Sequence, residues 1–213
     1  MRTRIKICGL TKAQDARWAV DAGADALGVI LHADSPRQVG LDAAEKIFSA
    51  VPPFVARVGV FVDAPERVVR LAVDRLRLDC VQFHGEERPE ICATAPARVI
   101  KAFRVGPDFS AATVEPYLEA VDAMLLDSFD PHRHGGTGVV FPWRIADGLS
   151  ERFALVLSGG LNPINVRDAI LTAKPFAVDV CSGVESSIGV KDRDTIGDFC
   201  EAVRRADVER AKR

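Results

Sequence analysis

Short apolar segments alternate with longer amphipathic segments along the whole chain. The apolar segments have the length and composition of strands, and the segments between them repeat apolar residues at helical spacing. In the segment at 65–76, Val69, Ala72, Val73 and Leu76 form one apolar stripe with charged residues opposite. The pattern predicts eight strands, at Arg4–Cys8, Ala26–Ile30, Ala56–Phe61, Asp79–Phe83, Arg98–Ala102, Ala123–Asp127, Phe153–Leu157 and Phe176–Val180.

The amphipathic segments predict a helix after each strand. Asn162 and Pro163 are typical of an N-cap followed by a first helical turn, and Pro116 is expected to shorten or kink its helix. The predicted helices are Lys12–Ala22, Leu41–Ala50, Pro65–Leu76, Glu87–Ala93, Ala111–Ala120, Pro142–Gly148, Pro163–Thr172 and Asp192–Ala206.

Strict alternation of strand and helix favours a parallel sheet, most simply a (β/α)₈ barrel. No charge block, serine-rich linker or low-complexity run divides the chain, so residues 1–213 are expected to form one barrel domain. An open, doubly wound sheet is the alternative. Its glycine-rich phosphate fingerprint would follow the first strand, and Cys8-Gly9-Leu10-Thr11 lacks that fingerprint.

The first strand combines an apolar face with a polar face. Ile5 and Ile7 share one side, whereas Lys6 and Cys8 share the other, which suits a barrel strand with helices outside and a reaction chamber inside. A free cysteine is often an ordinary buried apolar residue. Cys8, however, stands at a strand end before Gly9, and a neighbouring lysine favours the reactive thiolate. We therefore predict a chemically active Cys8.

Glycine-rich loops follow the last two predicted strands. Gly159 and Gly160 lie in the first loop, and Ser182 and Gly183 lie in the second. Small residues allow backbone N–H groups to approach an anion, and these two loops are the usual phosphate site of a (β/α)₈ barrel. One glycine pair could simply form a tight turn, but two such loops favour a phosphorylated substrate.

Further polar residues end other strands, where the active site of a barrel lies. Asp127 closes an apolar strand and could act as an acid or base in the barrel mouth. A thiolate base and a carboxylic acid suit proton transfer on a sugar phosphate. The other polar side chains expected at this end are Ser35, Arg37, Asp63, Gln82, His84, Lys101, Ser128, Ser158, Asn162, Asp179 and Glu185.

The loop after the sixth predicted strand contains both histidines and glycines. Its run Gly135-Gly136-Thr137-Gly138 is typical of a mobile lid. His132 and His134 could suggest a metal, but a His-x-His pair on a polar loop is more often solvated surface. Because no recognisable metal motif accompanies them, no metal site is expected.

Composition narrows the class of protein. Lys and Arg number 28 against 30 Asp and Glu, so the formal charge is −2 and favours neither nucleic-acid nor anionic-membrane binding. The five cysteines form no CxxC pair, which favours a reduced, cytoplasmic enzyme over a disulfide scaffold, with Cys80, Cys92, Cys181 and Cys200 assigned to packing. No signal segment precedes the first strand, and no apolar run is long enough to span a membrane.

A set of short motifs extends in order over nearly the whole chain: Lys6–Thr11, Ser35–Arg37, Val81–Gly85, Leu126–Ser128, Gly135–Gly138, Ser158–Val166, Val178–Glu185 and Gly189–Asp192. Each motif is short, but the ordered set is highly specific. It resembles the motifs of the phosphoribosylanthranilate isomerase family.

The resemblance implies a (β/α)₈ barrel that performs the Amadori rearrangement of tryptophan biosynthesis on N-(5-phosphoribosyl)anthranilate. It implies Asp127 as the general acid and Cys8 as the general base, with Arg37 on the anthranilate carboxylate and no metal or other cofactor. The remaining expected substrate contacts are Gln82, His84, Gly159, Gly160, Asp179, Ser182 and Gly183. Barrels of this kind can be monomers or homodimers.

Two alternatives differ in chemistry. Another sugar-phosphate barrel would use a different set of groups: an indole-glycerol-phosphate synthase would want a lysine and glutamates, and an epimerase a metal site or paired aspartates. A barrel that only binds phosphorylated ligands would need neither Cys8 nor Asp127, and both are present.

Overall fold

The computed structural model describes residues 2–106, 109–128, 143 and 149–212. The helix predicted at Pro142–Gly148 lies outside the described residues except for residue 143. His132, His134 and the glycine-rich run at 135–138 also lie outside them.

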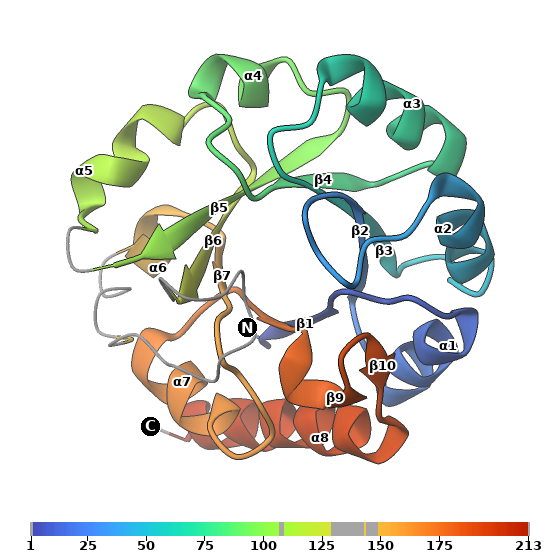
Figure 1. The fold of residues 1–213 in the computed structure, drawn as a ribbon. Coiled ribbons are helices and arrows are strands. Elements are labelled where there is room, and N and C mark those ends of the chain that lie inside the picture. Colours follow the sequence, from blue (N-terminus) through green and yellow to red (C-terminus); the bar gives the residue numbers. More distant parts are fainter. Residues whose placement is uncertain (1, 107–108, 129–142, 144–148, 213) are drawn as a thin grey trace.

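Eight parallel strands close into a barrel, with each strand paired to the next and β8 paired to β1. The helices form a ring around the strands (Figure 1). The predicted (β/α)₈ barrel is therefore confirmed, with strand ends that differ from the prediction by a few residues. The strands are β1 Arg4–Ile7, β2 Ala26–His32, β3 Ala56–Phe61, β4 Cys80–Phe83, β5 Arg98–Val105, β6 Ala123–Ser128, β7 Leu155–Leu157 and β8 Ala177–Val180.

The helices vary in length, and α8 is the longest of those described. Pro116 interrupts the predicted fifth helix, as expected, because the chain continues as a 3₁₀ turn at Glu115–Tyr117. The helices are α1 Ala13–Ala22, α2 Leu41–Phe48, α3 Glu66–Leu76, α4 Pro89–Ala93, α5 Ala111–Val114, α6 Leu149–Arg152, α7 Val166–Ala173 and α8 Arg193–Arg210.

The start of α7 differs from the prediction. The helix begins at Val166 after Asn165, not at Pro163. The side-chain oxygen of Asn162 accepts hydrogen bonds from the Ile164 and Asn165 amides, at 2.9 and 3.2 Å. Asn162 and Pro163 therefore form a local turn before the helix, because an Asn side chain can bond its own following backbone as readily as it can cap a helix.

A small hairpin between β8 and α8 is a feature that the sequence pattern did not predict. After a 3₁₀ turn at Ser182–Val184, β9 (Glu185–Ser187) pairs antiparallel with β10 (Val190–Lys191). Gly189 adopts φ +76° in the turn. Its carbonyl accepts a hydrogen bond of 2.6 Å from the Thr11 hydroxyl, which ties the hairpin to the loop after β1.

Alternation along the strands separates two apolar layers. The larger one lies between strands and helices, whereas Ala102, Leu125, Val156 and Ala177 form a small cluster on the opposite face of β5–β8, inside the barrel. Two residues beyond Leu125 and Ala177 come Asp127 and Asp179. Since strand residues two apart share a face, both carboxylates belong to the barrel interior near the carboxyl ends of their strands.

Candidate active site

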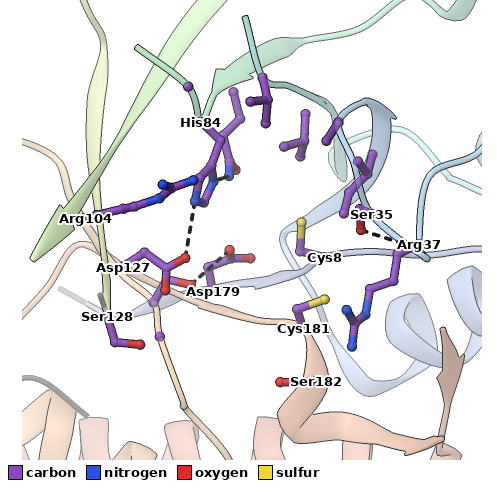
Figure 2. A pocket seen from close by; sticks show the side chains of 18 of the residues that line it. Cys8, Ser35, Arg37, His84, Arg104, Asp127, Ser128, Asp179, Cys181 and Ser182 are labelled. Carbon is purple, nitrogen blue, oxygen red and sulfur yellow. Dashed lines mark hydrogen bonds and ion pairs between the residues drawn. The ribbon is translucent and has the colours of Figure 1, made fainter. Parts of the chain in front are cut away.

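A cavity of about 540 Å³ opens at the carboxyl ends of the strands. Figure 2 shows Asp127 and His84 on one side of it, Arg37 on the other, and Cys8 and Asp179 between them. Among the expected acid–base residues and substrate contacts, Gly183 does not line the cavity. Those that do are Cys8, Arg37, Gln82, His84, Asp127, Gly159, Gly160, Asp179 and Ser182.

A buried ion pair lies beneath Cys8. Strand register sets Lys6 beside Asp179, and the Lys6 Nζ lies 2.8 Å from Asp179 Oδ1. The Ser158 hydroxyl donates to the other carboxylate oxygen at 3.4 Å. On the other side of β1, a Cβ added to Gly28 would lie 2.8 Å from the Cys8 sulfur and 3.2 Å from Lys6 Cε. Glycine at this point of β2 therefore leaves room for both side chains.

Burial raises the pKa of the Cys8 thiol above its ordinary value. Lys6 opposes this effect, but Asp179 reinforces it, and the net direction is upward. The expectation from sequence considered only the lysine. Because Lys6 is paired with a carboxylate, its positive charge is only partly available to stabilise a thiolate.

Asp127 contacts a histidine that is itself held by a glutamine. His84 Nε2 lies 3.2 Å from Asp127 Oδ2, and Gln82 Nε2 lies 3.0 Å from His84 Nδ1. With the Gln82 amide donating to Nδ1, a neutral imidazole carries its proton on Nε2 and donates it to the carboxylate. Gln82 and His84 thus orient the carboxylate that the family resemblance led us to expect as the acid.

The two glycine-rich loops lie against each other and against β6. A Cβ on Gly183 would overlap the Leu161 carbonyl oxygen, and one on Gly159 would overlap the Ser128 amide nitrogen. Gly159 and Gly160 also adopt φ values of +80° and +66°, which favour glycine. Within the described part of the chain, the amides of Gly159, Gly160, Ser182 and Gly183 donate no hydrogen bond to a protein acceptor. They are therefore available to an anion.

Arg37 is held by a glutamate from the unpredicted hairpin. Its Nε and Nη2 donate to the two oxygens of Glu185, at 2.8 and 2.6 Å, and the Lys191 ammonium donates to Glu185 Oε1 at 2.8 Å. Burial by itself would raise the Glu185 pKa, but the hydrogen bonds from Arg37 and Lys191 outweigh it and lower that pKa. Gly9, at φ +68°, permits this approach, because a Cβ there would lie 2.9 Å from Arg37 Cδ.

Some residues at the strand ends differ from the prediction. Because β5 continues to Val105, Arg104 lines the cavity beside its register partner Asp127. Lys101 is buried and donates to the Gly85 and Ala102 carbonyls, so it does not line the cavity. The alternation Phe103-Arg104-Val105 could have indicated the longer strand.

All five cysteines are free. Cys92 and Cys200 are buried, and burial raises the pKa of each to about 11. Cys181 was expected to be a packing residue, but it lines the cavity, and burial raises its pKa to about 12. The register explains this position, since Cys181 follows β8 as Cys8 follows β1.

The described residues contain no group of three or more His, Cys, Asp or Glu side chains placed to hold a metal ion. No helix among them is both long and apolar enough to cross a membrane.

Comparison with known proteins identifies the family. The model of the N-(5′-phosphoribosyl)anthranilate isomerase family matches residues 5–202. The chain belongs to this family. Isomerases of this name from Geobacter metallireducens and Geobacter sulfurreducens are 47% and 48% identical over 203 residues, covering 95% of this chain and 98% of each relative.

Solved structures of phosphoribosylanthranilate isomerases agree with this result. The Thermotoga maritima enzyme superposes with a TM-score of 0.86 at 40% identity, covering 95% of this chain and 99% of that one. A second structure, with TM-score 0.82, 40% identity and the same coverage, is a complex with reduced 1-(o-carboxyphenylamino)-1-deoxyribulose 5-phosphate. The chain is thus an enzyme of tryptophan biosynthesis that isomerises N-(5′-phosphoribosyl)anthranilate.

Proposed function

We propose that Cys8 and Asp127 carry out the acid–base steps of this isomerisation. The observation that supports the proposal is their common access to one cavity, where both line the wall near the strand ends. A thiol and a carboxyl group in one pocket can act as a complementary base and acid.

The first step opens the ribose ring. Asp127, in its protonated form, donates a proton to the ring oxygen while the bond between that oxygen and C1 breaks. The anthranilate nitrogen supplies its lone pair to C1, which gives a protonated Schiff base and an open-chain hydroxyl group. His84, 3.2 Å from the carboxylate, stabilises the ionised Asp127 that this step leaves.

The second step moves the double bond. The Cys8 thiolate removes the proton from C2, and the electrons of that bond form the C1=C2 double bond as the nitrogen becomes neutral. The resulting enolamine becomes the ketone when C1 gains a proton and the C2 hydroxyl loses one. The product is 1-(2-carboxyphenylamino)-1-deoxyribulose 5-phosphate.

Binding is assigned to groups around this pair. Arg37 holds the anthranilate carboxylate, because a guanidinium group offers several donors in one plane. The unpaired amides around Gly159, Gly160, Ser182 and Gly183 hold the phosphate, and Gln82, His84 and Asp179 complete the site. No residue in this scheme calls for a metal or another cofactor.

The proposal includes a single barrel domain over residues 1–213, working in the cytoplasm as a monomer or a homodimer. A dimeric phosphoribosylanthranilate isomerase is known from Thermotoga maritima, and the structure of its monomeric variants matches this chain with a TM-score of 0.83 at 37% identity. Gel filtration with light scattering would establish the oligomeric state.

The activity can be tested directly. Purified chain mixed with freshly prepared N-(5′-phosphoribosyl)anthranilate should quench the anthranilate fluorescence, with the same rate in a chelator, and NMR should identify the ketone product. Cys8→Ala and Asp127→Asn should each lower kcat by about two or more orders of magnitude, as loss of a general base or acid commonly does. If Cys8→Ala kept most of its activity, the base would have to be another residue.

A further inference from the structure

We propose that Glu185 and Lys191 are positioning residues that set the orientation and charge of Arg37 for the carboxylate of the substrate. This inference rests on the proposed role of Arg37. It assigns a function to the hairpin formed by β9 and β10, which supplies Glu185 and Lys191 and none of the acid–base groups.

The contact between Arg37 and Glu185 fixes the guanidinium plane. Two parallel N–H···O bonds, from Nε and Nη2, join it to both carboxylate oxygens. The side chains are 11% and 4% exposed. A bidentate pair of this kind holds a guanidinium group in one plane and one rotamer. Such a constraint is useful where a substrate carboxylate must meet its donor in a defined direction.

This arrangement leaves one guanidinium nitrogen for a ligand. Nη1 of Arg37 donates to no acceptor within the residues that the structure describes. Arg37 lines the cavity, and Figure 2 shows it beside Cys181, across the cavity from Asp127. The pairing with Glu185 therefore leaves both N–H donors of Nη1 available to the substrate.

Lys191 adjusts the charge of the cluster. An arginine paired with one glutamate is electrically neutral and would attract an anion weakly. The Lys191 ammonium, whose side chain is fully buried, adds a second positive charge to the same carboxylate at 2.8 Å. The group of Arg37, Glu185 and Lys191 thus carries a net charge of +1, which matches a single carboxylate.

Contacts of the hairpin hold the cluster in place. Lys191 also donates to the Cys181 carbonyl at 2.8 Å, and the Thr11 hydroxyl donates to the Gly189 carbonyl. The hairpin is therefore attached to the strand ends that carry Cys181 and Cys8. The residues that hold Arg37 are therefore attached to the same part of the barrel as the proposed base.

The alternative is that the hairpin has a purely structural role. A change of charge at Glu185 tests this, because it separates attraction of the carboxylate from orientation of Arg37. Glu185→Gln keeps the size of the side chain and raises the net charge of the cluster from +1 to +2. Its amide NH₂ group cannot accept a hydrogen bond, so the bidentate contact is lost. If attraction alone mattered, this variant would bind a carboxylate more tightly. If orientation matters, it binds more weakly.

The experiment compares two stable ligands by titration calorimetry. One ligand is the product analogue, reduced 1-(o-carboxyphenylamino)-1-deoxyribulose 5-phosphate. The other is the same compound without the carboxylate. The ratio of their two dissociation constants measures the preference of the enzyme for the carboxylated ligand. We expect Glu185→Gln and Lys191→Met each to reduce the preference of the native enzyme for the carboxylated ligand by about tenfold, the scale of one charge-assisted hydrogen bond. KM should rise more than kcat falls.

Controls separate positioning from folding. Glu209→Gln breaks a bidentate pair of the same kind with Arg167, outside the cavity, and should leave the preference unchanged. In an Arg37→Ala background, Glu185→Gln should cause no further loss of preference for the carboxylated ligand, because its effect passes through Arg37. Circular dichroism and thermal unfolding check each variant, and if Glu185→Gln does not fold, Lys191→Met carries the test.

Each remaining outcome has a distinct meaning. An unchanged or larger preference in Glu185→Gln overturns the inference, as does an equal further loss in the Arg37→Ala background. A native enzyme that isomerises its substrate but shows no preference overturns the role of Arg37 and the inference with it. Retention of most of the activity in Cys8→Ala or Asp127→Asn is a failure of the proposed acid–base roles and leaves the carboxylate preference, and so this inference, unaffected.

Discussion

His84 Nε2 lies 3.2 Å from Asp127 Oδ2, and the opposite ring nitrogen of His84 lies 3.0 Å from the Gln82 side-chain nitrogen. The imidazole is therefore held at both nitrogens. A residue fixed in this way can orient a carboxyl group and stabilise its ionised form without contacting the substrate carbon atoms. The pair thus links the end of β4 to the proposed acid on β6.

We predict that His84→Ala lowers kcat by about tenfold to a hundredfold, because it removes a charge-assisted hydrogen bond that stabilises ionised Asp127. His84→Gln, whose amide can reach toward the carboxylate, should retain more activity than His84→Ala. Steady-state kinetics by anthranilate fluorescence would measure both. Equal activity of the alanine variant and the native enzyme would contradict this account of His84.

The raised pKa of Cys8 predicts how its reactivity varies with pH. A thiol is alkylated as its thiolate, and the thiolate fraction rises as pH increases toward the pKa. Since burial raises the Cys8 pKa, alkylation by iodoacetamide should still be increasing at pH 9. Mass spectrometry of each cysteine-containing peptide gives the rate, and the product analogue should protect Cys8. A rate that levels off below pH 8 would show a thiol activated more strongly than the structure indicates.

Asp179 and Lys6 should move that pH profile in opposite directions. Asp179 raises the Cys8 pKa and Lys6 lowers it, so Asp179→Asn should shift alkylation to lower pH and Lys6→Met to higher pH. Each change also breaks a buried ion pair. We expect Asp179→Asn to cost about 3–5 kcal/mol of unfolding free energy, because Lys6 is left buried without its partner. Denaturant titration measures this cost, and shifts of the same sign in both variants would exclude the electrostatic explanation.

The sequence predicts the barrel well because the relevant signals are local. Apolar alternation identified each strand of the barrel within a few residues, and Pro116 marked the end of α5. Cys8 and Asp127 stand at strand ends, so the topology of a parallel barrel is enough to bring them to one cavity. This part of the site needs no knowledge of side-chain geometry.

The other part depends on contacts between distant segments. Arg37 and Glu185 are 148 positions apart, and their pairing follows from a short hairpin that has no strong period-two pattern. Lys6 looks like an activating cation in the sequence, but its partner Asp179 comes from β8. Pairing across the closure of the barrel decides how much of its charge is available to Cys8.

Gly183 offers a test of how the two glycine-rich loops cooperate. Although it does not line the cavity, a Cβ at this position would overlap the Leu161 carbonyl oxygen, so Gly183→Ala must push the loops apart. We expect a loss of about 1–3 kcal/mol in unfolding free energy, typical of a steric insertion into a packed region. We also expect a clear rise in KM, because the amides proposed to hold the phosphate would separate. Gly197→Ala is the matched control, since nothing lies within 4 Å of the added Cβ in α8, and it should stabilise the protein by about 0.5–1 kcal/mol. Thermal unfolding and the affinity for inorganic phosphate would be measured for both variants. A Gly183→Ala enzyme with native phosphate affinity would mean that the loops bind the anion independently of their contact.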